Sequence, residues 1–316
     1  MRVLTVSPRT RREILKVWYH ALRPFSYPAS IVPVLVGTVI AWHDGYVNST
    51  LFLLALIGSV AIQAGTNLSN EYFDYVQGVD KPDSLGPAGV ILQGELKPEQ
   101  VLRAAILSFA VGVVLGLYIV WQVGVVVLLL GLASLLAAWF YTAKPLTLGY
   151  RGLGEPEVFI FMGPIMVTAS YYVQARSFTW TPLLVSFPVG FLVMAILHAN
   201  NLRDIEQDKE RRRLTWAVLA CNTFGMKRGE NMSRWIFYAM LGGAYLSLII
   251  LAAESIVPLP ALLAFLTIPQ AYSLIRFVAS GVKGKPLSRA VRGTAFLHMT
   301  FGVTLTLGYL VGMVVH

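Results

Sequence analysis

Nine long apolar stretches constrain this chain more than any other feature of its sequence. They lie at about 24–42, 51–73, 101–121, 123–141, 156–174, 182–200, 233–253, 257–278 and 293–315. A hydrocarbon core roughly 30 Å thick is crossed by a helix of about 20 apolar residues. Because lipid offers no water to the peptide groups, such a stretch must be helical. A closed barrel would show alternating segments of about ten residues, which this sequence lacks. It therefore predicts an all-α, polytopic membrane protein with about nine transmembrane helices.

The composition agrees with a membrane protein and excludes several other classes. Of the 316 residues, 56% are hydrophobic and only 13% are charged, whereas a soluble domain has roughly 25% charged residues. This is too little charge to cover a water-facing surface, which excludes a soluble globular enzyme and a disordered chain. The single cysteine, Cys221, has no partner for an internal disulfide, so the chain is not a secreted disulfide scaffold.

The positions of the basic residues predict the orientation. If the N-terminus lies inside, all 25 Lys and Arg residues except Arg176 fall in inner segments, which is the bias that membrane proteins show. We therefore expect residues 1–22 to form a basic cytoplasmic tail. Residues 23–316 should form a single transmembrane domain whose C-terminus lies on the opposite side. Because this bias accounts for the net charge of +9, a nucleic acid partner is not needed.

The acidic residues gather on the same side of the membrane as the basic ones. Of the 16 Asp and Glu residues, only Asp44 and Glu254 fall in outer segments. Orientation does not require this, because acidic residues contribute little to it. Acids and bases on one face indicate a polar site for a charged ligand, and the alternative is a set of ordinary solvated loops.

The first of two polar clusters follows the second apolar stretch. It consists of Asn67, Asn70, Glu71, Asp74 and Asp80. Its first four members are three and four residues apart, so they share one face of a helix. A turn beyond that helix would bring Asp80 back towards Asp74.

The second cluster ends the sixth apolar stretch. Asn200, Asp204 and Asp208 occupy successive turns of one helical stripe. The Asn-x-x-x-Asp spacing of the first cluster recurs here, and an even number of spans separates the two clusters. Both should therefore lie on one side of the membrane. The three arginines at 211–213 are interpreted as charge at the membrane surface.

The residue types of the two clusters indicate a metal. Carboxylate and amide oxygens, with no thiols and no paired histidines, suit Mg²⁺ and argue against zinc. Two such clusters facing each other would hold two Mg²⁺ ions across a diphosphate. The alternative is that these acids pair with nearby Lys and Arg at the helix ends. Both clusters therefore offer candidate metal ligands.

Basic residues near the clusters are further candidates. Lys144 and Arg151, which follow the fourth apolar stretch, either neutralise diphosphate oxygens or are ordinary loop charges. Arg203 and Lys209 are interleaved with the second cluster. Arg23, before the first stretch, either holds an anionic substrate or extends to the membrane interface.

The motifs around both clusters resemble the UbiA superfamily of intramembrane prenyltransferases. Asn-x-x-x-Asp-x-x-x-Gly-x-Asp runs from 70 to 80, and Asn-Asn-x-Arg-Asp-x-x-x-Asp runs from 200 to 208. Leu-Gly-Pro at 85–87 and Tyr-Arg-Gly-Leu-Gly-Glu at 150–155 look most like the MenA branch, the 1,4-dihydroxy-2-naphthoate polyprenyltransferases of menaquinone biosynthesis. The resemblance implies about nine helices around a central cavity with a cytoplasmic polar cap.

The resemblance also implies an activity and a set of site residues. A polyprenyl group would pass from an allylic diphosphate, held by two Mg²⁺ ions, to an aromatic acceptor; for a naphthoate acceptor CO₂ would be lost. The implied catalytic residues are Asp74, Asp80, Asp204, Asp208 and Tyr141, with the tyrosine near the scissile allylic carbon and Asp80 a candidate base. The implied metal ligands are Asn70, Asp74, Asp80, Asp204 and Asp208. The expected diphosphate-binding residues are Asn67, Asn70, Lys144, Arg151, Arg203 and Lys209, and the expected substrate pocket holds Tyr72, Phe73, Asn200, Asn201 and Arg23.

Two alternatives stay open at this point. Ser84 and Gly89 stand where MenA-like sequences often have arginine, so the acceptor could instead be a benzoate, a homogentisate-like ring or an alcohol. From another class, a cation-coupled transporter would carry broken helices and polar residues near the membrane midplane. The acids here lie at the ends of apolar stretches, which favours the enzyme. The sequence does not indicate an oligomeric state; the expected partners are the prenyl diphosphate, the acceptor and membrane lipid.

Overall fold

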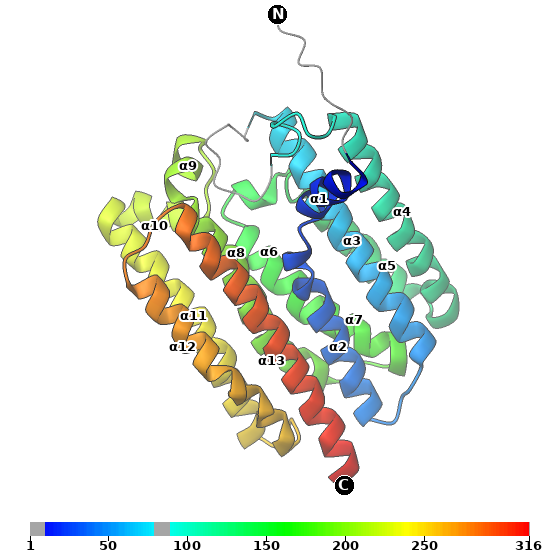
Figure 1. Cartoon of the computed structure of the whole chain (residues 1–316). Coiled ribbons are helices and arrows are strands. Elements are labelled where there is room, and N and C mark those ends of the chain that lie inside the picture. The colour runs from blue at the N-terminus through cyan, green and yellow to red at the C-terminus, as the bar shows by residue number, and fades with distance from the viewer. Residues whose placement is uncertain (1–9, 79–88, 316) are drawn as a thin grey trace, which may run out of the picture.

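The computed structural model of the chain describes residues 10–78 and 89–315, and within these ranges it is helical and contains no strand (Figure 1). Seven helical segments are long and apolar enough to cross a membrane: α3 (Ser49–Val76), α4 (Pro98–Val123), α6–α7 (Gly154–Ala175), α8 (Trp180–Arg203), α11 (Met226–Ala253), η4–α12 (Leu259–Ala279) and η5–α13 (Lys285–Val314). They coincide with seven of the nine predicted stretches. The prediction of an all-α polytopic membrane protein is therefore confirmed.

The two remaining predicted stretches are also helical. α5 (Val125–Phe140) is shorter, with 16 residues, and α2 (Pro28–His43) is bent by 46° relative to the segment Arg11–Ser26. The count of nine membrane crossings stays a prediction. The shorter elements are α1 (Arg11–Leu22), η1 (Pro24–Ser26), η2 (Leu148–Tyr150), α9 (Ile205–Glu210) and α10 (Trp216–Phe224).

Helix α8 lies at the centre of the bundle and carries the second polar cluster at its C-terminal end (Figure 1). It packs against α11, α13, α2 and the π-helical turn η3 (Phe161–Ile165). Its apolar residues face every side, as expected for a buried helix. A Cβ atom added to Gly163 would lie 2.9 Å from the Cα of Gly190. The α6–α7 segment and α8 therefore approach backbone to backbone, a contact that small residues allow between membrane helices.

Helix α1 lies within the stretch that the sequence assigned to the N-terminal tail. The side chain of Thr10 caps its first turn and Glu13 returns the contact, which is a capping box. Val17 and Ala21 are buried against the bundle, while Ile14 and Tyr19 are exposed. The chain then turns at Arg23, which has a φ of 51°. This turn places Arg23 at the entrance of the bundle.

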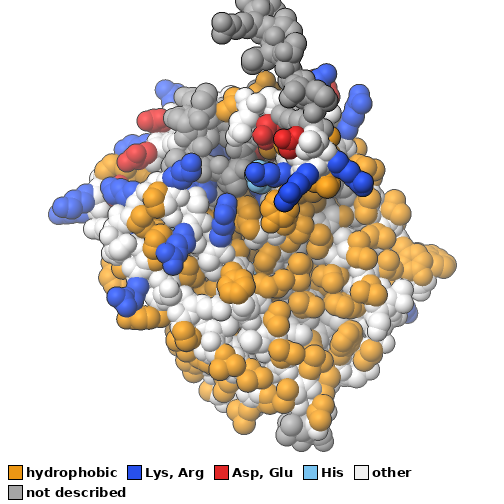
Figure 2. Space-filling model, in the orientation of Figure 1, with side chains coloured by type: hydrophobic (Ala, Val, Ile, Leu, Met, Phe, Trp, Pro, Cys, Tyr) orange, Lys and Arg blue, Asp and Glu red, His pale blue; other side chains and the backbone are white. Residues whose placement is uncertain are grey.

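Charged side chains gather at the end of the molecule where α3 and α8 finish, and hydrophobic side chains predominate over most of the rest of the visible face (Figure 2). Helix α1 lies at this charged end, and the last turn of α13 lies at the other (Figure 1). Both polar clusters therefore lie at one end of the bundle, as the even number of intervening spans predicts.

Candidate active site

A cavity of about 310 Å³ lies between the two polar clusters. Its walls come from the segment after α1, from α3, α5, α6, η3 and α8, and from α9 with the chain that follows it. The fold therefore brings most of the predicted site residues together. Those that line the cavity are Arg23, Asn67, Asn70, Asp74, Tyr141, Asn200, Asn201, Arg203, Asp204 and Asp208.

Five described residues of the predicted site do not line this cavity: Tyr72, Phe73, Lys144, Arg151 and Lys209. The Phe73 ring packs edge-on against Trp139, with 5.2 Å between ring centres. The Arg151 guanidinium donates a hydrogen bond of 2.9 Å to the carbonyl oxygen of Pro145. Asp80, the candidate base and metal ligand, lies outside the described residues.

Arg213 joins the two polar clusters. Its Nη2 donates to Asp74 at 3.1 Å and its Nη1 donates to Asp208 at 3.4 Å. The guanidinium also lies 4.1 Å from the centre of the Tyr150 ring, whose hydroxyl donates to Asp74. One side chain therefore contacts a carboxylate of each cluster, so the two acids share a single positive charge.

Burial shifts the pKa values of Asp208 and Tyr150, which both contact Arg213. It raises the pKa of Asp208 to about 7, although the charge of Arg213 acts in the opposite direction. Burial and then the charge of Asp74 raise the pKa of Tyr150, so its hydroxyl remains protonated and donates to that carboxylate. The charge of Arg213 therefore opposes part of the effect of burial and favours the anionic form of Asp208.

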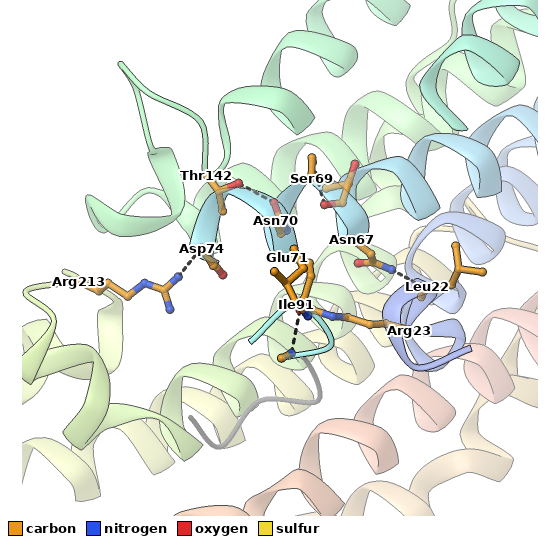
Figure 3. A network of polar contacts seen from close by, with 12 residues as sticks. Leu22, Arg23, Asn67, Ser69, Asn70, Glu71, Asp74, Ile91, Thr142 and Arg213 are labelled. Carbon is orange, nitrogen blue, oxygen red and sulfur yellow. Dashed lines mark hydrogen bonds and ion pairs between the residues drawn. The ribbon is translucent and has the colours of Figure 1, made fainter. Parts of the chain in front are cut away.

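Glu71 ties three segments of the chain together beside the first cluster (Figure 3). It is fully buried. Its carboxylate accepts a hydrogen bond of 3.0 Å from the Arg23 guanidinium and another of 2.9 Å from the backbone N–H of Gly89. Asn67, one turn earlier, donates to the carbonyl oxygen of Leu22 at 2.9 Å. These bonds hold the turn after α1 and the chain from Gly89 onward against α3, so part of the first cluster serves to shape the cavity wall.

The second cluster is held by its own neighbours. Arg203 donates two hydrogen bonds to the Asp204 carboxylate, at 2.7 and 2.6 Å. Asn201 donates at 2.8 Å to Glu155, which also lies 3.2 Å from the His198 ring nitrogen Nδ1. Glu155 and His198 are fully buried. This contact fixes the start of α6 against α8 and so orients the cavity wall that α6 provides.

Tyr141 fits closely against two glycines. A Cβ atom on Gly149 would lie 2.8 Å from the Cζ of Tyr141, and one on Gly154 would lie 3.4 Å from its hydroxyl oxygen. The backbone N–H of Gly149 also donates to the carbonyl oxygen of Tyr141 at 2.9 Å. The glycines of the 148–154 segment therefore set the position of this ring at the cavity wall.

The comparison with known families identifies the fold. The model of the UbiA prenyltransferase family matches residues 30–311. The chain belongs to this family. Two relatives of known activity named 1,4-dihydroxy-2-naphthoate octaprenyltransferase are similar to it. The one from Bacillus subtilis is 31% identical, over 94% of this chain and 93% of the relative. The one from Escherichia coli is 32% identical, over 90% and 94%.

Solved structures of UbiA proteins share the fold. A UbiA homologue from Archaeoglobus fulgidus, bound to GPP and Mg²⁺, matches with a TM-score of 0.57 and 14% identity, covering 92% of this chain and 99% of that one. The structure of a digeranylgeranylglyceryl phosphate synthase matches with a TM-score of 0.55 and 15% identity, covering 96% and 100%. At such low identity the likeness concerns the fold alone.

The donor set of this UbiA site fits magnesium. Among residues 10–78 and 89–315, no group of three or more His, Cys, Asp or Glu side chains is arranged to hold a metal ion by itself. Asp74 and Asp208 nevertheless face one guanidinium, and Asn70 and Asp204 line the same cavity. Mg²⁺ is commonly bound by one or two carboxylates together with substrate phosphates. The observed oxygens suit that mode.

The cavity also has ionisable residues outside the predicted site, including Tyr150, Glu157 and Arg213. Tyr150 was noted only as part of a motif, and Arg213 was assigned to a run of surface charge. Glu157 had a signal that was not used, since it is an acid inside an apolar stretch. Ionisable residues at membrane depth are rare and usually functional.

Proposed function

We propose that this UbiA protein transfers a polyprenyl group from an allylic diphosphate to 1,4-dihydroxy-2-naphthoate, with loss of CO₂, in menaquinone biosynthesis. The observation that carries the proposal is the joining of Asp74 and Asp208 by Arg213 at the polar mouth of the cavity. The relatives named for this activity, which match over almost their whole length, support the naphthoate acceptor. The charged end is proposed to face the cytoplasm, with residues 1–22 as a tail and 23–316 as one domain.

The polar mouth would bind the diphosphate of the donor. Asn70, Asp74, Asp80, Asp204 and Asp208 would hold two Mg²⁺ ions, which supply Lewis acidity for the departure of the diphosphate. The proposed diphosphate ligands are Asn67, Arg203 and Arg213 in the cavity wall, with Lys144, Arg151 and Lys209 nearby. Arg203 and Arg213 already face carboxylates, so positive charge is in place where negative charge develops.

The rest of the cavity would hold the prenyl chain and the acceptor. The wall below the polar mouth is mostly apolar and includes Ala137, Phe161 and Leu197; it excludes water from the reacting carbon. Tyr141 would shield the developing allylic cation by cation–π attraction. Tyr72 and Phe73, which stack with each other at 5.3 Å, would support that shielding from outside the lining, and Asn200, Asn201 and Arg23 would contact substrate.

The test is direct. Purified protein in detergent with Mg²⁺, geranylgeranyl diphosphate and 1,4-dihydroxy-2-naphthoate should give a prenylated product without the carboxylate, detected by mass spectrometry, and EDTA should abolish it. Asp74→Asn and Asp208→Asn should lower kcat at least about 100-fold, consistent with loss of electrostatic stabilisation. Asp44→Asn, at the opposite end of the bundle, is the matched control and should retain activity.

Three other results would each contradict a different part of the proposed function. Release of diphosphate without that product would keep the prenyltransferase and replace the acceptor. Near-normal turnover in either cavity variant would remove the two-cluster mechanism. Failure to consume several prenyl diphosphates would leave the transporter as the better hypothesis.

A further inference from the structure

Glu157 is a carboxylate inside the cavity that lacks a partner on one oxygen. It lies on α6 (Gly154–Ile160), one turn after Gly154, and lines the cavity. Its Oε2 is buried and accepts no hydrogen bond. A buried polar atom left unpaired is costly, about 1–3 kcal/mol and more for a charged group. Such an atom in a binding cavity indicates that a ligand supplies the missing donor.

The other acids around the cavity are already engaged. Glu71 bonds to Arg23, Asp204 to Arg203, and Asp74 to Arg213. Glu155, only two residues before Glu157, accepts hydrogen bonds from Asn201 and from the backbone of Trp216. The Oε2 of Glu155 is also buried without a partner, but Glu155 does not line the cavity. Glu157 is distinguished because it lines the cavity and its unpartnered oxygen is therefore next to the space that a substrate would occupy.

The surroundings of Glu157 place it at the reacting end of the substrates. Gly154 packs against the Tyr141 hydroxyl, and residues three apart on a helix share a face, so Glu157 projects from the face of α6 that meets Tyr141. Glu157 and Tyr141 both line the cavity. Its near neighbours along the lining, Val158 and Phe161, are apolar. The carboxylate therefore lies in the water-poor part of the cavity.

The missing hydrogen-bond donor decides which substrate meets Glu157. The ionised diphosphate and the prenyl chain of the donor carry no O–H or N–H group that could donate to its unpartnered oxygen. The acceptor has ring hydroxyls. We propose that Glu157 binds the acceptor through a ring hydroxyl and removes its proton during prenyl transfer, an inference that rests on the proposed function. This role would belong to Glu157 and not to Asp80.

The step is balanced in atoms and electrons. The Glu157 carboxylate takes the proton of the hydroxyl next to the reacting carbon, and the O–H electron pair moves into the ring. The ring carbon that bears the carboxylate bonds to the allylic carbon while the allylic C–O bond breaks, and the diphosphate leaves with that electron pair. Loss of the ring carboxylate as CO₂ returns an electron pair to the ring. The ring oxygen then takes the proton back from Glu157, which regenerates the carboxylate.

Two substitutions separate binding from proton transfer. Glu157→Gln keeps an oxygen that accepts the hydroxyl hydrogen but is too weak a base, so kcat should fall about 100-fold or more while the Kd of the acceptor changes less than about threefold. Glu157→Ala removes the hydrogen bond as well, and the Kd should rise about tenfold, since a hydrogen bond to a charged group contributes about 1.5 kcal/mol or more. The donor KM should not change in either variant. Glu99→Gln, an exposed acid outside the cavity, is the matched control.

Binding is measured without donor, by quenching of tryptophan fluorescence with 1,4-dihydroxy-2-naphthoate and with its 1-methyl ether. The wild-type protein should bind the ether about tenfold more weakly than the parent ring, and Glu157→Ala should bind both alike. Gel filtration and thermal unfolding check that each variant is folded. Wild-type kcat in Glu157→Gln, or a raised donor KM with unchanged acceptor binding, overturns the inference.

Failure of the proposed function gives a different pattern. If the wild-type protein does not prenylate the naphthoate, the same binding comparison is made with 4-hydroxybenzoate and homogentisate and their methyl ethers. Weaker binding of a hydroxylated ring to Glu157→Ala then keeps the inference for another acceptor. Equal binding of every ring to wild type and variant rejects it.

Discussion

Replacing Arg213 with alanine should destabilise the metal-free protein strongly and the substrate-loaded protein much less. In the metal-free protein the Arg213 guanidinium faces Asp74 at 3.1 Å and Asp208 at 3.4 Å. The Asp208 side chain is 3% exposed and that of Asp74 is 14% exposed. Removing one partner of a buried ion pair costs about 3–5 kcal/mol, because the remaining charge is left uncompensated.

The lower end of that range applies here. The Arg213 side chain is 19% exposed, so water compensates part of the lost charge. Protonation of Asp208, whose pKa burial raises to about 7, removes a further part near neutral pH. We therefore expect a loss of about 3 kcal/mol in the free energy of unfolding for Arg213→Ala, to which the cation–π contact with Tyr150 contributes about 0.5–1 kcal/mol. Arg213→Lys keeps the charge but not both contacts, so its loss should be about half as large.

The assay is chemical unfolding in detergent, followed by tryptophan fluorescence, with EDTA and again with Mg²⁺ and a non-hydrolysable prenyl thiodiphosphate. Cations bound between the carboxylates would replace the missing charge, so the difference between wild type and Arg213→Ala should shrink to about 1 kcal/mol in the loaded protein. A loss below about 1 kcal/mol with EDTA, or an equal loss in both conditions, would show that Arg213 does not bridge the two clusters.

Three further predictions follow from particular residues. Gly149→Ala would place a methyl group 2.8 Å from the Tyr141 ring and should lower kcat at least about tenfold in steady-state assays, whereas Gly116→Ala, with open space around it, should not. Arg212 has a φ of 56°, so Arg212→Gly should leave stability unchanged or raise it by up to about 1 kcal/mol, while Arg212→Val should lower it; chemical unfolding decides. In metal-free protein the pKa of Asp208 is raised from 3.8 to about 7, so folding favours its protonated form. Its contribution to stability should be full below pH 3.8 and lost as the pH rises through about 7, and Asp208→Asn should abolish this slope.

The sequence predicted the helices because their cause is local. A stretch of about 20 apolar residues is helical in lipid whatever surrounds it, and the Asn-x-x-x-Asp spacing places its residues on one helical face. The sequence also predicted that Asp74 and Asp208 lie at the same end of the bundle, because an even number of spans separates them. These predictions needed no knowledge of side-chain packing.

The role of Arg213 depends on a turn that the sequence does not reveal. The chain reverses at Arg212, which adopts a left-handed conformation that glycine would favour. The backbone N–H of Arg213 then donates to the carbonyl oxygen of Asp208 at 2.8 Å, so its side chain turns back over the cluster. In a run of three arginines nothing distinguishes the inward one from the two others.

The pairing of charges divides the cavity into two regions with different chemistry. At the mouth, Arg23, Arg203 and Arg213 each face a carboxylate, so the charges are balanced before substrate arrives. A prenyl diphosphate and two divalent cations bring nearly opposite charges, and each can take over a partner from an existing pair without leaving a buried charge alone. Deeper in the cavity Glu157 has a buried oxygen without such a partner. A hydroxyl group from the acceptor is then the donor that this oxygen lacks, and the same division that lets the mouth exchange ions leaves the base free for the ring.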